Sequence, residues 1–361
     1  MREVLGELLE AWRGGEPAAL ATVTATWSSA PRQPGAAMLV RADGTAVGSV
    51  SGGCVEGDVY ETCREVAESG EPRTVRYGVT DDDALRVGLP CGGTIELFVE
   101  RAGFPELEAL AAEVAADRPV ALLTGVDGPV AGRHLVLTPA QRHGSLGSAA
   151  ADAAATGEGR LLLAAGRTGL VRPGAGAAVL VTSFVPAARM LVFGATDHAA
   201  AVARLGSFLG YRVTVCDARP VFATAERFPG AAEVVAAWPH RYLAAEAEAG
   251  RLDGRTVVCV LTHDAKVDVP LLEVALRLPL AYVGAMGSRR AHDDRVKRLR
   301  AAGVDEAALA RLASPIGLDL GARTPEETAV SVAAEIVARR GRGTGAPLSG
   351  ASGPIHRGEV I

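Results

Sequence analysis

The sequence Gly48-Ser49-Val50-Ser51-Gly52-Gly53-Cys54-Val55-Glu56-Gly57-Asp58 marks a change from strand to helix. Residues 45–50 alternate as a strand does, two glycines allow a tight turn, and apolar residues then recur at helical spacing. Cys54 is therefore expected at the start of a helix, where free N–H groups and the helix dipole attract anions and favour a thiolate. Two interpretations stay open: a small buried thiol beside a turn, or a thiol that handles a ligand.

The composition is that of an ordered globular protein, and it excludes several functions. Hydrophobic residues make up 48% of the 361 positions, enough for two or three domains with their own cores. A net charge of -5 and an aromatic content of 4% argue against a nucleic-acid partner. No apolar run approaches the roughly 20 residues that span a bilayer. The amino end resembles an amphipathic helix and not a signal peptide, so we expect a cytoplasmic protein with free thiols.

Residues 1–186 are predicted to form a mixed α/β domain. The pattern indicates a helix over 3–12, a strand over 19–26, and a hairpin over 38–50 that leads into the Cys54 turn. Arg32 lies in the Ser-, Pro- and Gly-rich loop before the hairpin. It is either an ordinary exposed arginine or a clamp for a phosphate or carboxylate.

A second glycine-flanked thiol lies further along this domain. Cys91 is followed by Gly92 and Gly93 and precedes a predicted strand over 94–100. Two such arrangements suggest thiols held where the backbone meets a ligand. Structural zinc is disfavoured, because it needs four ligands at close spacing. A disulfide between Cys54 and Cys91 stays open, since sequence does not fix the distance between their Cα atoms.

Residues 105–183 carry weaker patterns. The predicted elements are a helix over 107–114, strands over 120–123, 135–137, 161–164 and 179–184, and a small-residue loop over 144–159. His134 and His143 have no partner in the sequence pattern and are expected to be structural or exposed. The other three cysteines are expected in cores: Cys63, Cys216 and Cys259.

After residue 186 strands and helices alternate, which predicts a Rossmann-like parallel-sheet domain over 187–340. A strand over 190–193 precedes a turn with Gly194 and Thr196, and the next strand ends at Asp217. This is the layout of a dinucleotide-binding βαβ unit, in which the acidic residue binds a ribose. Thr196 replaces the glycine that lets the backbone approach a pyrophosphate, so the pattern supports the fold without assuring a nicotinamide cofactor.

Two more strand ends in this domain carry polar residues. His263 and Asp264 follow a buried strand over 256–261, at the edge where open α/β sheets bind ligands. A strand over 280–283 precedes a sequence typical of an anion-binding nest before a helix: Gly284, Gly287, Ser288, Arg289 and Arg290. The two arginines either bind an anion or begin a solvated helix. A capping box at 324–327 starts a last helix, and 341–361 are predicted to be a disordered tail.

Several of these segments together resemble the XdhC/CoxI family. The resemblance covers residues 19–100 and 190–340 and rests on the motifs Ser51-Gly52-Gly53-Cys54-Val55-Glu56, Cys91-Gly92-Gly93, Leu261-Thr262-His263-Asp264, Tyr282-Val283-Gly284-Ala285-Met286-Gly287-Ser288-Arg289-Arg290 and Pro315-Ile316-Gly317-Leu318-Asp319. Members of that family are accessory factors for molybdenum hydroxylases such as xanthine dehydrogenase and aerobic carbon monoxide dehydrogenase. Their Rossmann-like turn usually contains Gly-Ala-Gly-His, where this chain has Gly194-Ala195-Thr196-Asp197.

The resemblance implies a maturation factor without turnover of its own. It would bind the molybdenum cofactor (molybdopterin) transiently, support its sulfuration and insert it into an apo-molybdenum hydroxylase. A cysteine desulfurase and a second copy of the chain, giving a homodimer, are further partners to test. Arg289 and Arg290 are expected near the cofactor phosphate, and Cys54 and Cys91 near its metal. The full set of expected binding residues is Arg32, Ser51, Gly52, Gly53, Cys54, Glu56, Cys91, Gly92, Gly93, Gly194, Thr196, Asp217, His263, Asp264, Gly284, Gly287, Ser288, Arg289 and Arg290.

Two other functions stay open. Asp217 and Arg219 in the βαβ layout favour an NAD(P)-binding oxidoreductase. The two glycine-flanked thiols alone favour a carrier of redox equivalents or of persulfide sulfur. No Ser-His-Asp or paired-carboxylate constellation in the sequence indicates catalysis.

Overall fold

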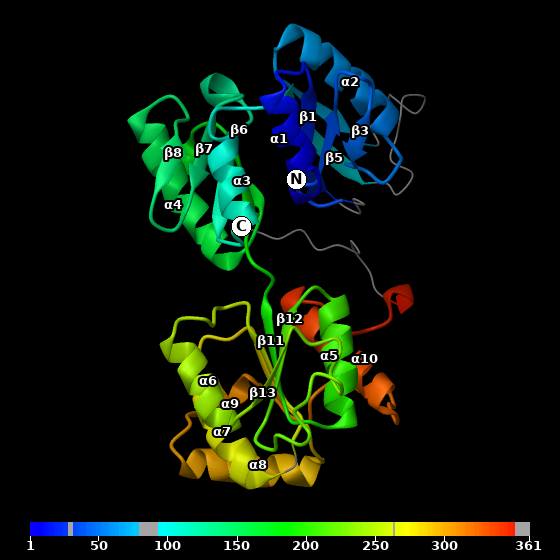
Figure 1. The fold of residues 1–361 in the computed structure, drawn as a ribbon, viewed down its shortest axis with the longest axis vertical. Helices are drawn as coiled ribbons and strands as arrows, with labels where there is room; N and C mark the ends of the chain where they lie inside the picture. The colour runs from blue at the N-terminus through cyan, green and yellow to red at the C-terminus, as the bar shows by residue number, and fades with distance from the viewer. Residues whose placement is uncertain (28–31, 79–92, 263, 351–361) are drawn as a thin grey trace. The chain divides into compact units, whose positions relative to one another are not determined.

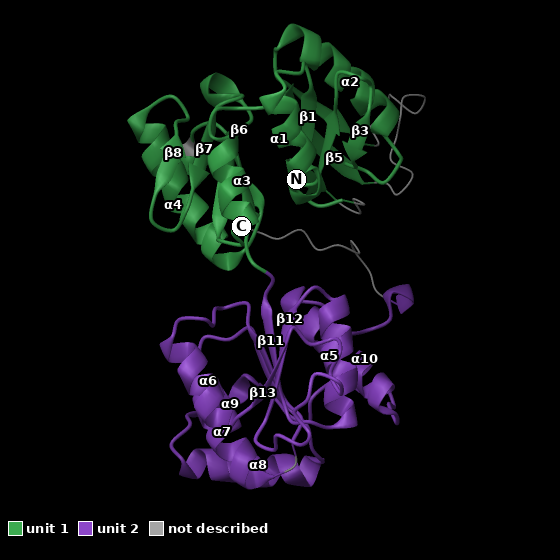
Figure 2. Cartoon of the chain, viewed as in Figure 1, with its two compact units in different colours: residues 1–186, 352–361 green, residues 187–351 purple. Residues whose placement is uncertain are grey.

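The computed structural model describes residues 1–27, 32–78, 93–262 and 264–350. They divide into two units, residues 1–186 and 187–351 (Figure 2). The first unit contains two antiparallel five-stranded sheets, and the second contains one parallel six-stranded sheet. The predicted fold class, a mixed α/β part followed by a Rossmann-like parallel-sheet part, is confirmed. Every helix among the described residues is too short or too polar to cross a membrane.

The first sheet has the strand order β3-β2-β1-β5-β4. Its strands are β1 (Ala19–Trp27), β2 (Ala37–Val40), β3 (Ala46–Gly48), β4 (Arg73–Tyr77) and β5 (Thr94–Arg101). Alternate residues of β1 point to opposite faces, so that each face has its own apolar core. The short helix η1 (Arg2–Val4) and α1 (Leu5–Arg13) pack on one face, and α2 (Glu56–Ser69) packs on the other (Figure 1).

The second sheet has the strand order β8-β7-β6-β10-β9. Its strands are β6 (Val120–Gly125), β7 (His134–Leu137), β8 (Arg142–Gly144), β9 (Gly169–Val171) and β10 (Val179–Phe184). Helix α3 (Leu107–Ala115) packs on one face and α4 (Ala149–Ala165) on the other. Two 3-10 turns, η2 (Gly128–Val130) and η3 (Pro173–Ala175), complete this part of the first unit.

Helix α4 corrects two predictions, the loop over 144–159 and the strand over 161–164. Ser148 begins the helix by accepting a hydrogen bond from the Ala151 N–H at 3.2 Å, and Gly166 ends it at φ 64°. The many alanines favour a helix. Gly159, which counts against a helix in the sequence, allows close packing here, because a Cβ would lie 3.0 Å from Leu137.

The expectation that His134 has no partner is wrong. Its ring is buried, lies 3.1 Å from the Glu100 carboxylate, and stacks on Phe104 with ring centroids 4.0 Å apart. Glu100 belongs to β5 and His134 to β7, so this contact joins the two sheets of the first unit. His143 is exposed, as predicted.

The parallel sheet of the second unit has the order β13-β12-β11-β14-β15-β16. Its strands are β11 (Arg189–Phe193), β12 (Arg212–Asp217), β13 (Glu233–Ala236), β14 (Val257–Val260), β15 (Tyr282–Ala285) and β16 (Leu312–Ala313). Numbered within the unit, this order is 3-2-1-4-5-6, the doubly wound order of dinucleotide-binding folds. The chain reverses direction across the sheet between β11 and β14, which sets the position of any ligand crevice.

Helices cover both faces of this sheet. Helices α5 (Asp197–Phe208) and α10 (Pro325–Arg340) pack on one face. The other face is covered by α6 (Pro239–Glu248), α7 (Ala265–Arg277), α8 (Arg289–Ala301) and α9 (Glu306–Ala310) (Figure 1). The predicted capping box is confirmed: Thr324 accepts from the Glu327 N–H, and the Glu327 carboxylate accepts from the Thr324 N–H. Within the predicted tail, Leu348–Gly350 form a 3-10 turn (η4), and 351–361 lie outside the described residues.

A buried carboxylate in α6 ties this helix to the start of β11. Glu246 is bonded to Arg251 and to Arg189. Arg251 lowers the pKa of the carboxyl, burial opposes that effect, and Arg189 lowers the pKa further, to about 2. The stabilisation is therefore complete above the ordinary pKa of about 4.5 and is lost as the pH falls towards 2.

Glu246→Gln is expected to lower the free energy of unfolding by about 2 kcal/mol at pH 7, with roughly half of that difference gone at pH 3. Urea titrations of the full chain at the two pH values measure it. Glu248→Gln, an exposed position on the same helix, is the control and should change stability little at either pH. A Glu246→Gln deficit that is as large at pH 3 as at pH 7 would contradict this account.

Candidate functional site

Three loops of the first unit leave from the same end of its first sheet. Trp27, the last residue of β1, pairs with Thr94, the first of β5, and Tyr77 at the end of β4 pairs with the next residue of β5. Ala37 begins β2 and Gly48 ends β3 at the same end. The strand pairing therefore brings together the attachment points of loops 28–36, 49–55 and 78–93, which are far apart in sequence.

These loops carry the predicted residues of the first unit. Arg32 lies in the first, where its guanidinium is 3.7 Å from the Glu3 carboxylate, a partly exposed pair. Cys54 lies in the second. Cys91 and Gly92 belong to the third and lie outside the described residues, and Gly93 beside them is buried. The thiol pair therefore stays a prediction.

The turn after β3 wraps around the carboxylate of Glu56. The backbone N–H groups of residues 50–53 donate to it at 2.8–3.3 Å. The Ser49 hydroxyl donates to it at 2.7 Å, and so does the Ser51 hydroxyl. Consecutive N–H groups that converge in this way form a nest for an anion, and here the chain supplies the anion itself.

Gly52 and Gly53 make this wrapping possible. Their φ angles are 78° and 113°, a region that residues with a Cβ rarely adopt. A Cβ at either position would meet no described atom within 4 Å. Backbone conformation, and not a close contact, is therefore what requires glycine at both positions.

Glu56 is ionised at neutral pH. Burial raises the pKa of its carboxyl, but the hydroxyls of Ser51 and Ser49 and the Ser51 N–H outweigh burial and bring the pKa to about 2. The negative charge also lies in the first turn of α2, where the helix dipole favours it.

Cys54 lies directly beside this filled nest. Its own N–H and that of Val55 donate to the Ser51 hydroxyl, at 2.9 and 3.0 Å. The N–H groups of residues 50–55 around the thiol are therefore taken by Ser51 and Glu56. The Cys54 side chain is half-buried and packs against the core under α2. Cys63, Cys216 and Cys259 are buried, as predicted.

The end of β4 is tied to the start of α2. The Tyr77 hydroxyl, at the end of β4, donates to the Asp58 carboxylate at 2.6 Å. Asp58 lies in the first turn of α2, only four residues after Cys54. The two loop ends that flank this hydrogen bond therefore lie close to one another.

Ser51→Ala is expected to lower the free energy of unfolding by about 2 kcal/mol, because it removes a donor to Glu56 and the acceptor of two N–H groups. Chemical denaturation of the full chain measures the loss. Ser69→Ala, at the exposed end of the same helix, is the matched control and should stay within about 0.5 kcal/mol of the parent. Equal losses of stability in the two variants would show that the hydrogen bonds of the Ser51 hydroxyl do not stabilise the turn.

In the second unit the ligand crevice of the fold lies at the carboxyl ends of β11 and β14. Gly194 follows β11 at φ 113°, and a Cβ there would lie 3.0 Å from the carbonyl carbon of Leu261, which follows β14. Thr196 caps α5 by accepting from the Ala199 N–H at 3.2 Å. Packing of two strand ends therefore accounts for the glycine at position 194, and capping of α5 accounts for the threonine at position 196.

The polar groups that a dinucleotide would use are bonded within the chain. Asp217 is buried and accepts from the Ala195 N–H at 2.7 Å and from the Arg219 guanidinium at 2.9 Å on each oxygen. Burial raises the pKa of Asp217, but the bonds from Arg219 and Ala195 outweigh it and lower the pKa. A ribose hydroxyl would have to displace Arg219.

We expect NADH and NADPH to show no saturable binding up to about 1 mM. Any binding free energy would then be weaker than about -4 kcal/mol. Isothermal titration of the full chain measures it. Arg219→Ala, which releases Asp217 from its ion pair, is the informative variant: binding gained only there would identify Arg219 as the block. Sub-millimolar binding by the parent chain would contradict the expectation.

The sequence between β15 and α8 places two exposed arginines beside a capped helix start. Ser288 caps α8 by accepting from the Ala291 N–H at 3.2 Å, and Gly287 before it has φ 153°. Arg289 and Arg290 are exposed, and neither has an ion-pair partner among the residues that the structure describes. Positive side chains and helix N–H groups at one place favour an anion.

Gly284 has a different explanation. It lies within β15, and a Cβ there would be 2.6 Å from the Ile316 side chain. The strand needs glycine at this position so that Ile316 can pack on it. Ile316 belongs to a loop that Glu335 holds in place, by accepting from the Gly317 N–H at 2.7 Å and from the Tyr282 hydroxyl at 2.6 Å.

A buried ion pair that the sequence analysis missed holds this edge together. Arg295 of α8 lies 3.1 Å from Asp268 of α7, with side chains 6% and 4% exposed. Asp268 accepts from the Thr262 hydroxyl, and Arg295 donates to the Met286 carbonyl at 2.8 Å and to Ser314 at 2.9 Å. These contacts join the residues that follow β14, β15 and β16. The sequence does contain one sign of this pair, since Asp268 lies on an otherwise apolar face of α7.

An open pocket lies at the start of α8. Its volume is about 410 Å³, and its lining residues are Met286, Gly287, Ser288, Ala291 and Arg295. The predicted residues Gly287 and Ser288 are thus brought together with Arg295, which no motif indicated. Asp264 has another role, since it caps α7 by accepting from the Lys266 N–H at 2.9 Å, and His263 lies outside the described residues.

Comparison with known families agrees with both halves of this architecture. A model of the XdhC and CoxI family matches residues 11–78, and a model of the XdhC Rossmann domain matches residues 190–336. The chain belongs to the XdhC/CoxI family. Both matched stretches include a loop edge described above, the Glu56 turn in one and the start of α8 in the other.

Relatives extend over nearly the whole chain. The molybdenum cofactor insertion chaperone PaoD of Escherichia coli (strain K12) is 28% identical, over 94% of this chain and 88% of its own length. A Bacillus subtilis (strain 168) protein named as a probable subunit of xanthine dehydrogenase is 29% identical, over 91% and 94%. A crystal structure of a Bacillus halodurans protein named as a xanthine dehydrogenase matches with a TM-score of 0.65 at 26% identity, over 95% and 97% of the two chains.

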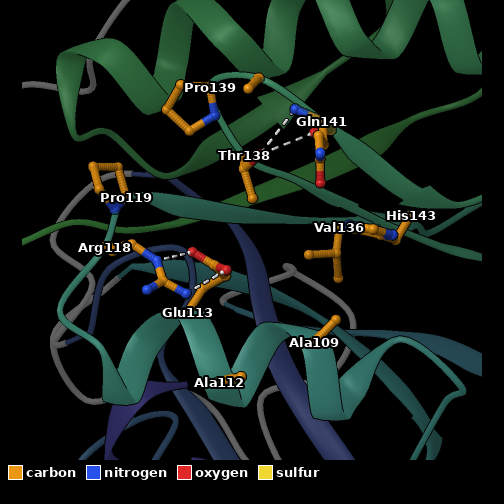
Figure 3. Close-up of a pocket in the computed structure, with 11 residues that line it drawn as sticks. Ala109, Ala112, Glu113, Arg118, Pro119, Val136, Thr138, Pro139, Gln141 and His143 are labelled. Carbon is orange, nitrogen blue, oxygen red and sulfur yellow. Dashed lines mark hydrogen bonds and ion pairs between the residues drawn. The ribbon is translucent and has the colours of Figure 1, made fainter.

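This XdhC/CoxI family protein has a further pocket in the part that neither family model matches. It lies between α3 and the β7–β8 hairpin, with a volume of about 410 Å³ (Figure 3). Figure 3 shows the Glu113–Arg118 ion pair, with nitrogen and oxygen 2.7 Å apart, on its α3 side. None of the binding residues expected from the sequence lines it.

The predicted metal ligands are Cys54 and Cys91. Within the described ranges no three His, Cys, Asp or Glu side chains lie close enough together to hold a metal ion. Cys54 is thus the single predicted ligand that the structure describes. The donor set fits an anionic group at the start of α8 better than it fits one at the Glu56 turn, because the donors of that turn are already filled.

Proposed function

We propose that this protein is an accessory factor that binds the molybdenum cofactor, supports its sulfuration and inserts it into an apo-molybdenum hydroxylase in the cytoplasm, without turnover of its own. The observation that carries the proposal is the match to the insertion chaperone PaoD over 94% of this chain and 88% of that one. Because the match spans both units, we assign the role to the two units together.

The phosphate of the cofactor belongs at the start of α8. A phosphate needs donors and positive charge that are free to meet it. Arg289 and Arg290 are exposed there beside the capped helix start, whereas Asp217 and Thr196 at the neighbouring crevice are bonded within the chain. The pocket lined by Gly287 and Ser288 gives the anion a place against the backbone.

The sulfur-handling step of the proposal belongs to Cys54 of the first unit. The thiol is half-buried and lies at the loop end of the first sheet, the end at which β4 stops and β5 begins. A thiol that is not fully buried is the kind of nucleophile that sulfur chemistry needs. The acceptor is an apo-molybdenum hydroxylase, with a cysteine desulfurase as sulfur source and a homodimer as the assembly to test.

The purified protein is expected to carry pterin and molybdenum in near-equal amounts when it is produced together with cofactor synthesis. Replacing both Arg289 and Arg290 by alanine should weaken cofactor binding by about tenfold to a hundredfold, through loss of two charged donors to phosphate. Pterin fluorescence after oxidation and elemental analysis for molybdenum measure the bound amounts.

Replacing Lys297 and Arg298 by alanine removes the same charge from the exposed far part of α8 and is the matched control. Cys54→Ser should leave phosphate-end binding intact and impair transfer of active cofactor to an apo-enzyme. A parent protein that never carries pterin or molybdenum would overturn the proposed function.

A further inference from the structure

We propose that Glu56 is a positioning residue for Cys54: its carboxylate is the resident anion of the nest formed by residues 49–53 and fixes the turn that presents the thiol. The functional importance of this inference rests on the proposed role of Cys54 in cofactor handling.

The nest exists only when it is filled. Four consecutive N–H groups, those of residues 50–53, point at one carboxylate, and the positive φ angles of Gly52 and Gly53 aim them there. Without an anion these donors would repel one another and face solvent. Two glycines in the turn, around whose missing Cβ atoms there is open space, would then let it rearrange.

Ser51 transmits the position of the carboxylate to Cys54. Its hydroxyl donates to Glu56 Oε2 and accepts from the N–H groups of Cys54 and Val55. A hydroxyl has one proton, so donating it to Glu56 turns the oxygen lone pairs towards those two N–H groups. The carboxylate thereby holds the backbone of Cys54 through a single intermediate side chain.

No other acid in the first turn of α2 is free to take this place among the described side chains. Asp58, the second acid of that turn, accepts the Tyr77 hydroxyl at 2.6 Å. The arrangement is therefore specific to Glu56. It also predicts that a small carboxylate added to the solution can fill the nest when the side chain of residue 56 is removed.

The test uses the full chain with Glu56→Ala and measures how fast iodoacetamide, an uncharged reagent, alkylates Cys54, with the modified peptide counted by mass spectrometry. We expect about fivefold faster alkylation than in the parent, because the turn loosens and exposes the thiol more often. Formate at about 100 mM should bring the rate back to within about twofold of the parent, by mass action on the emptied nest. Chloride at equal ionic strength should not.

Two controls separate this from a general loss of structure. Glu68→Ala removes an exposed acid from the far end of the same helix and should leave the Cys54 rate unchanged. Alkylation of buried Cys63 reports whether the core has opened. An unchanged Cys54 rate in Glu56→Ala, or a faster rate that formate does not restore, overturns the proposal.

If Glu56→Ala does not fold, Glu56→Asp decides in its place. Its carboxylate is one methylene shorter and misses part of the nest, so a Cys54 rate above that of the parent supports positioning and an equal rate overturns it. Neither assay contains cofactor. A negative result therefore leaves the proposed function standing, and absence of pterin and molybdenum leaves the role of Glu56 standing.

Discussion

Donors at the loop edges of this protein are bonded by carboxylates of the chain itself. Glu56 takes the N–H groups of the turn before α2, and Asp217 takes the Ala195 N–H beside β11. Buried backbone donors must be paired, and a charged acceptor pairs them more strongly than a neutral one. The same hydrogen bonds that shape these loop edges also occupy the donors, so that an anion from solution cannot bind to them. The start of α8 differs, since its two arginines have no ion-pair partner among the described residues.

This distribution changes the meaning of the sequence motifs. Glycine, serine and an acid beside a strand end indicate an anion site by their types alone, and both halves of the chain carry them. In the first unit the acid of the motif is the anion. In the second, Ser288 and Gly287 shape the backbone while the charge is left on neighbouring arginines. The motif residues are therefore of two kinds: those that fix the conformation of the loop, and those whose charged side chains stay available to a ligand.

Local patterns were sufficient for much of the fold. The strand, turn and helix around Cys54, the alternation of strands and helices in the second unit and the capping box at Thr324 depend on neighbours a few residues away, and each is confirmed. Helix α4 was missed because its glycines count against a helix until Leu137 is seen to pack on one of them. The Arg295–Asp268 pair could not be found from spacing, since 27 residues separate its partners. The candidate thiols were located as residues, but the donors around Cys54 depend on Glu56 folding back onto its own turn.

The hydrogen bond between His134 and Glu100 has a mechanical consequence for the first unit. Both groups are buried, and the apolar core around them is shared by α1, α3 and strands of both five-stranded sheets. Sliding one sheet past the other would break that polar contact and open the shared core, so the pair resists shear. The two sheets are consequently expected to move together at this contact and not to slide along it.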